Sequence, residues 1–141
     1  MKHLFGLLFE RHQDLFYVVF RVLVGLLFFQ HGAQKLFGLF GAKGSVELFS
    51  LMGLAGTIEF FGGLAIALGL LTRLSALFGI ASMAWAYFLF HMDISNIPDG
   101  LVPIMNKGEL ALLYLAAFLV IFAYGAKKFC LEEKLLGREL F

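Results

Sequence analysis

The sequence predicts an all-α membrane protein, a four-transmembrane-helix bundle with both termini in the cytoplasm. Of its 141 residues, 61% are hydrophobic and 15% are charged. Ordinary soluble domains are about 45–50% apolar and about 25% charged, and a soluble fold of this size could not bury so much apolar surface. Four apolar runs are long enough to cross a bilayer. The net charge of +1 gives no indication of a nucleic-acid partner.

The first predicted span covers residues 15–37, after a lead-in (residues 1–14) that fits a short interfacial helix or a disordered segment. It carries Arg21, His31 and Lys35 within an apolar run. Ionic groups inside a membrane span are costly, so they indicate a functional or structural role. At helical spacing one face combines polar and small residues, with His31 beside it. This stripe consists of Arg21, Gly25, Phe28, Gly32 and Lys35.

The second and third spans are predicted at residues 51–71 and 74–90, joined by a connection so short that they form an antiparallel hairpin. The second span has one charge, Glu59, on its small-residue face. Small residues let membrane helices approach closely. Trp85 near the end of the third span suits an interfacial aromatic belt. Residues 38–50 and 91–106 are predicted as loops. Whether a short surface helix follows the first loop is left open.

The fourth span is predicted at residues 107–126, with Glu109 in its first turn, where a carboxylate interacts favourably with the helix dipole. The tail that follows has charges of alternating sign and is predicted to be a short amphipathic segment on the membrane surface. Seven of the eleven Lys and Arg residues fall on the side of the two termini. The positive-inside rule therefore places both termini in the cytoplasm.

Most of the ionic and polar residues of the spans fall near the outer ends of the helices, at a rise of about 1.5 Å per residue. The sequence therefore predicts an outward-open polar pocket lined by His31, Lys35, Glu59, Glu109 and His91. A His–Glu pair can relay protons near neutral pH, and Tyr114 with the phenylalanines could hold an aromatic ring. This combination favours quinone-type or small-anion chemistry.

Structural interpretations stand beside this one. Glu59 with Arg21 or His31 could be an ion pair that locks the bundle. Arg21 could extend to the cytoplasmic headgroups, and Lys35 and Lys107 could be interfacial anchors. His31 and His91 could ligate a haem iron, but two membrane histidines are a weak signal for haem. Cys130 is the only cysteine, which excludes an intrachain disulfide and a thiolate metal cluster, so no metal site is predicted.

The ordered set of motifs from Phe16 to Leu131 resembles the DoxX family of small bacterial membrane proteins. The match runs through Arg21 with Gly25, His31-Gly32-x-x-Lys35-Leu36-Phe37-Gly38, Glu59-x-x-Gly62-Gly63, Gly69-Leu70-Leu71-Thr72-Arg73, Asn106-x-Gly108-Glu109 with Tyr114, and Gly125-Ala126. The resemblance implies a four-helix bundle in the bacterial inner membrane. It also implies a subunit of a thiosulfate–quinone oxidoreductase, or a membrane partner of thiol and oxidative-stress enzymes.

Our functional hypothesis is a quinone-linked oxidoreductase subunit, with quinone as the candidate cofactor. His31, Glu59 and Glu109 would handle protons, and Arg21, Lys35, Tyr114, His91 and Asn106 would bind the substrate. The alternative is a non-catalytic anchor or assembly factor that recruits soluble redox enzymes. A small-solute carrier is disfavoured, since the sequence shows no broken helices or inverted repeats. The small residues also make a homo-oligomer in the bilayer plausible.

Overall fold

The computed structural model describes the backbone of residues 2–137 and the side chains of residues 12–135 and 137, all of them in helices or loops. The first helix, α1, runs unbroken over Lys2–Phe37. The second predicted span is built from α2 (Leu51–Thr57), the π-helical turn η1 (Ile58–Gly62) and α3 (Gly63–Leu68). The third consists of α4 (Thr72–Ala86) and the π-helical turn η2 (Tyr87–His91). Two further helices, α5 (Pro103–Asn106) and α6 (Glu109–Tyr124), precede the short terminal helix α7 (Leu131–Leu136).

Three of these helical stretches are long and apolar enough to cross a membrane, namely His12–Phe37, Leu51–Leu68 and Thr72–His91. The fourth, α6, has 16 residues and is about 24 Å long, which is short for a span. The described chain is therefore a helical membrane protein with three long apolar helices and one shorter one.

Several boundaries differ from those predicted. The lead-in to α1 is neither a separate helix nor disordered, because α1 already begins at Lys2. The second span ends at Leu68 rather than residue 71, since Gly69 adopts a left-handed conformation (φ 70°). The Leu70 amide then bonds to the Ala65 carbonyl at 2.9 Å, which closes a Schellman motif. The loop 38–50 contains turns and no helix.

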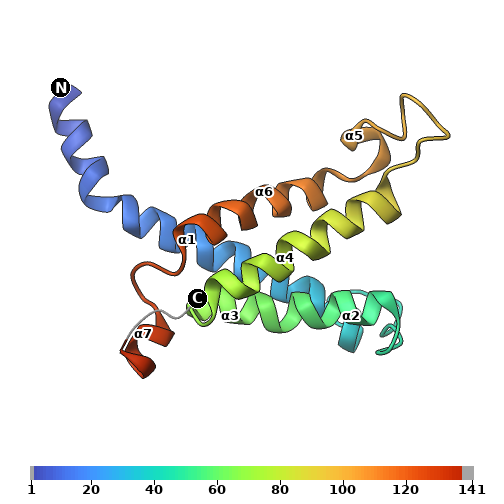
Figure 1. Cartoon of the computed structure of the whole chain (residues 1–141), viewed down its shortest axis with the longest axis horizontal. Helices are drawn as coiled ribbons and strands as arrows, with labels where there is room; N and C mark the ends of the chain where they lie inside the picture. The colour runs from blue at the N-terminus through green and yellow to red at the C-terminus, as the bar shows by residue number, and fades with distance from the viewer. Residues whose placement is uncertain (1, 138–141) are drawn as a thin grey trace.

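The helices pair in two layers that diverge toward one end of the molecule (Figure 1). In the first layer α1 packs along α2, η1 and α3, and in the second α4 packs along α6, with α4 also touching η1. Glycines bring the first layer together. A Cβ atom built on Gly63 would lie 2.6 Å from the Gly25 carbonyl oxygen, so the two backbones are in direct contact. This confirms that the small-residue stripe of the first span is a packing face.

An apolar core joins the two layers where they cross. It contains Phe28 of α1, Ile66 of α3, Ala76 of α4, and Phe118 and Ile121 of α6, each at most 1% exposed. The Phe28 and Phe118 rings meet edge to face with centroids 4.6 Å apart. Many other large apolar side chains of the spans are exposed, as expected for surfaces that contact lipid.

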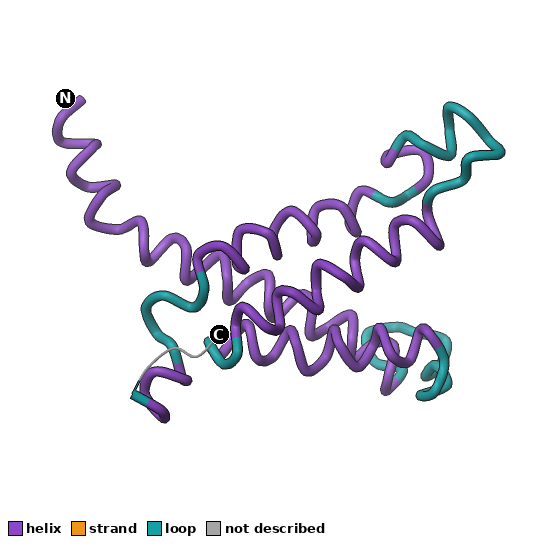
Figure 2. The backbone as a smooth tube through the Cα atoms, viewed as in Figure 1, coloured by secondary structure: helices purple, strands orange, loops and turns teal. Residues whose placement is uncertain are grey.

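The segment after α6 folds back onto the end of the bundle opposite the long loops (Figure 2). The Tyr17 hydroxyl donates to the Gly125 carbonyl at 2.5 Å, and Lys128 lies 3.1 Å from the Asp14 carboxylate. The Cys130 thiol donates to the Gly69 carbonyl at 3.2 Å and is buried. Part of the tail predicted to lie on the surface is therefore docked against the helices; its last four residues lie outside the described chain.

Candidate functional site

An open groove of about 670 Å³ separates the two layers at the end where they diverge. Its floor comes from α1, one wall from α2 and η1, and the other from α4, η2 and α6. The lining is mostly apolar, with seven polar or ionisable residues among its members: His31, Lys35, Glu59, Ser82, His91, Lys107 and Tyr114. A mainly apolar cavity of this size with a few convergent polar groups is typical of a small-molecule site.

Glu59 forms the centre of the polar group. It sits in η1, and its side chain is only 2% exposed. The Lys35 ammonium pairs with Glu59 Oε1, while Oε2 has no hydrogen-bond partner among the described residues. A buried carboxylate oxygen without a hydrogen-bond partner is costly.

The sequence positions this ion pair through a glycine on the facing helix. A Cβ atom built on Gly56 would lie 3.1 Å from the Lys35 Cβ, so the lysine stem runs against bare backbone there. The stem can therefore follow the helix surface and deliver its ammonium to Glu59, one turn further along the second span. The Lys35 side chain is 24% exposed, so water reaches the cation but not the carboxylate.

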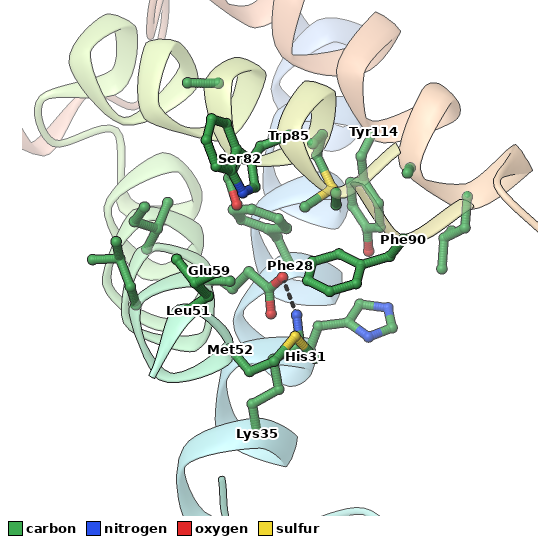
Figure 3. Close-up of a pocket in the computed structure, with 18 of the residues that line it drawn as sticks. Phe28, His31, Lys35, Leu51, Met52, Glu59, Ser82, Trp85, Phe90 and Tyr114 are labelled. Atoms are coloured by element: carbon green, nitrogen blue, oxygen red, sulfur yellow. Dashed lines mark hydrogen bonds and ion pairs between the residues drawn. The ribbon is translucent and has the colours of Figure 1, made fainter. Parts of the chain in front are cut away.

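His31 and Tyr114 flank the ion pair (Figure 3). Their rings meet edge to face with centroids 5.8 Å apart. Figure 3 shows the ion pair in the middle of the groove, with His31, Tyr114 and Phe90 to one side and Leu51 to the other. Protein groups able to exchange protons thus lie beside a surface able to hold an aromatic ring.

His91 lines the same groove from the end of η2. Its Nδ1 lies 3.1 Å from the Asn106 carbonyl oxygen. Because a carbonyl only accepts, Nδ1 carries the proton in this contact, and Nε2 is the acceptor of the neutral ring.

Three residues predicted to bind substrate or handle protons do not line the groove. Arg21 lies ten residues before His31 on α1, about 15 Å along the axis. Its guanidinium is buried and donates to the carbonyls of Ile66 at 2.5 Å and Phe129 at 3.2 Å. The prediction that Arg21 and Lys35 orient one ligand group is thus at odds with the geometry, since Arg21 lies fourteen residues before Lys35, about 21 Å along the axis of α1.

Glu109 and Asn106 are the other two. Glu109 begins α6, after a break in the helix at Lys107 (φ 61°), and its exposed side chain does not line the groove. Asn106 uses its side chain to hold the loop: Nδ2 donates to the Gly100 carbonyl at 3.0 Å, and Oδ1 accepts from the Gly108 amide at 2.8 Å. It nevertheless positions His91 through its own carbonyl.

Sequence reasoning missed Trp85 and the two π-helical turns. Trp85 was assigned to an interfacial belt, yet it also forms part of the groove wall. The turns η1 and η2 carry Glu59 and His91, and π-helical turns are frequent at functional sites. Each turn contains two adjacent aromatic residues, Phe60-Phe61 in η1 and Tyr87-Phe88 in η2, and the two turns share this feature in the sequence.

Comparison with known proteins decides the family. The DoxX family profile matches residues 16–92, more than half of the chain. The chain belongs to the DoxX family. The chain is also similar to an uncharacterized protein of Haemophilus influenzae, 35% identical over 129 residues, which cover 89% of this chain and 94% of the relative. No solved structure matches this DoxX chain.

Proposed function

We propose that this DoxX protein is the membrane subunit of a quinone-linked oxidoreductase, and that the groove binds the quinone ring. In this proposal the four apolar helices span the bacterial inner membrane with both termini in the cytoplasm. The observation that carries it is Glu59, a buried carboxylate that lines the apolar groove, with one oxygen held by Lys35 and the other without a hydrogen-bond partner among the described residues.

The groove suits a flat ring better than a small anion. Phe28, Trp85, Phe90 and Tyr114 line it, and its volume of about 670 Å³ is many times that of a small inorganic anion. Aromatic rings stack or meet edge to face with such side chains at a gain of about 0.5–1.5 kcal/mol per pair. A small anion would leave most of the apolar wall uncovered.

The polar side chains supply what a quinone needs at its oxygens. Reduction of a quinone to a quinol takes up two electrons and two protons, one proton at each ring oxygen. In their protonated forms, the Glu59 carboxyl and the His31 imidazolium can each pass one proton to a ring oxygen and take a replacement proton from water at the mouth of the groove, and Lys35 can stabilise charge that develops on the ring oxygen. We assign the electrons to a reduced dithiol or sulfur compound, oxidised by a partner enzyme to a disulfide or a more oxidised sulfur species with release of two electrons.

The protein contains one tryptophan, Trp85, which gives a direct test. Titration of the purified protein with a benzoquinone carrying a short alkyl chain should quench Trp85 fluorescence saturably. For the corresponding quinol, whose hydroxyl can donate to the Glu59 carboxylate, Glu59→Gln should weaken binding roughly 10- to 100-fold, since a hydrogen bond to a charged group contributes about 1.5–3 kcal/mol. Glu109→Gln, whose side chain lies outside the groove, is the matched control and should bind normally. Quenching that never saturates, or that is equal in both variants, would rule the proposal out.

One observation favours the alternative of a non-catalytic anchor for soluble redox enzymes. The Lys35–Glu59 pair joins α1 to η1, so it also fits a lock that holds the bundle. In that case Glu59→Gln should lower the stability of the protein while no quinone binds to either form.

A further inference from the structure

We propose that the ligand reaches the groove sideways, from the lipid between α2 and α4, and that it is an amphiphile whose apolar tail stays in the bilayer. This inference rests on the proposed function, because it describes how the proposed quinone site is reached. It narrows the substrate class to a lipid-dissolved ring with a long apolar chain.

The first support is the way the two walls part. Helix α4 packs on η1 and α3 but makes little contact with α2, the segment just before η1. Figure 1 shows α2 and the end of α4 diverging toward the side of the long loops. The groove is therefore lined by α2 on one side and α4 on the other, with few contacts between the two helices.

The second support is the chemistry of the two lips of the opening, which are formed by α2 on one side and by α4 and η2 on the other. Leu51 and Leu54 of α2 are 59% and 57% exposed, and Trp85 of α4 and Phe90 of η2 are 58% and 57% exposed. All four line the groove. A passage that filled from water would present polar side chains at its mouth, whereas apolar lips are compatible with hydrocarbon.

The third support is the depth of the opening. Trp85 lies six residues before His91, about 9 Å from the end of its helix, and Leu54 lies about 5 Å inside the start of α2. Both belong to stretches apolar enough to cross a membrane. The lips thus face the apolar layer of the bilayer rather than the polar loops.

The lining of the groove is also polar at its floor and apolar at its α2–α4 opening. The ion pair, His31 and Tyr114 meet at the floor, where α1 contributes Lys35, while the α2–α4 opening is apolar. The charged lining residues Lys35, Lys107 and Glu59 sum to one positive charge, which complements oxygen atoms that become anionic. An amphiphile fits this arrangement with its ring oxygens toward the Lys35 ammonium and its tail leaving past Leu54 and Trp85.

The test compares two ligands with the same benzoquinone ring, one bearing a decyl chain and one bearing a short poly(ethylene glycol) chain. Both are titrated into protein in lipid nanodiscs, with Trp85 fluorescence as the readout. The decyl ligand should bind at least about tenfold tighter, since several polar ether groups would have to enter hydrocarbon. Equal affinities would overturn lateral access but leave the quinone site intact. No saturable binding of either ligand would instead refute the quinone site itself.

A second measurement tests whether the ligand passes between α2 and α4. Ala55→Phe places a ring in the wall of α2 beside the opening, and Ala65→Phe makes the same change on α3, outside the groove. Ala55→Phe should weaken decyl-ligand binding about tenfold relative to Ala65→Phe. Equal binding by the two variants would contradict a route between α2 and α4. If Ala55→Phe does not fold, the comparison of the two ligands on the unmodified protein still decides the question.

Discussion

Replacing Lys35 by methionine tests the energetics on which the site depends. The substitution keeps the apolar stem that runs against Gly56 and removes the only ion-pair partner of Glu59 among the described residues. Breaking a buried pair by removing one partner costs about 3–5 kcal/mol, because an uncompensated charge stays buried. Since the Lys35 side chain is 24% exposed and Glu59 is 2% exposed, we expect the low end of that range, about 3 kcal/mol.

The assay is thermal unfolding in detergent, followed by Trp85 fluorescence. A loss of about 3 kcal/mol should lower the Tm by roughly 10 °C for a chain of this length. Lys43→Met, at an exposed loop lysine, is the matched control and should change the Tm little. Adding Glu59→Gln to Lys35→Met should restore most of the loss, because the buried charge is then gone. If the two substitutions instead add independently, the ion pair does not exist in the membrane protein and the reasoning on Glu59 fails.

Two further predictions concern packing and the tail. Gly63→Ala should destabilise the helix pair by several kcal/mol in unfolding experiments, because the added Cβ would lie 2.6 Å from the Gly25 carbonyl oxygen. Gly62→Ala is the control and should be tolerated, because the nearest atom to its Cβ would be 4.0 Å away. Arg21→Met should loosen the docked tail and speed alkylation of the buried Cys130 by a maleimide, whereas Arg73→Met, at an exposed position, should leave the rate unchanged. Slow, equal labelling of both arginine variants would contradict a role of Arg21 in holding the tail.

The sequence was sufficient to predict the helices and to predict which polar residues lie near one end of the bundle. Hydropathy and helical periodicity placed His31 and Lys35 on α1, Glu59 on the second helix and Tyr114 on the fourth, all near one end of the bundle. The structure brings these residues into one groove together with His91. This worked because ionic side chains in membrane helices seldom face lipid, so their depth and face indicate where they meet.

The sequence was not sufficient to predict features that depend on contacts between backbone groups far apart in the chain. The partners identified for Arg21 are carbonyl oxygens, one of them at Phe129 in the docked tail, 108 residues away. No pattern of side chains encodes such a partner. The π-helical turns η1 and η2 depend likewise on how each helix packs, since hydropathy does not distinguish an α-helical from a π-helical turn. Glu109 was placed in the pocket because it lies at the same end of the bundle as the other polar groups, but depth alone does not fix which way an exposed side chain faces, and Glu109 does not line the groove.

The two cations of α1 differ in their partners. Arg21 donates to carbonyl groups of α3 and of the tail, so it joins segments of backbone. Lys35 holds a carboxylate whose other oxygen is buried without a hydrogen-bond partner among the described residues. Between them lie Phe28, Ile66 and Phe118, at most 1% exposed, which provide no polar path from one end to the other. Because a buried ion pair gains stability only when its remaining lone pairs are also bonded, the unpartnered second oxygen of Glu59 makes the Lys35–Glu59 pair costly as a purely structural lock.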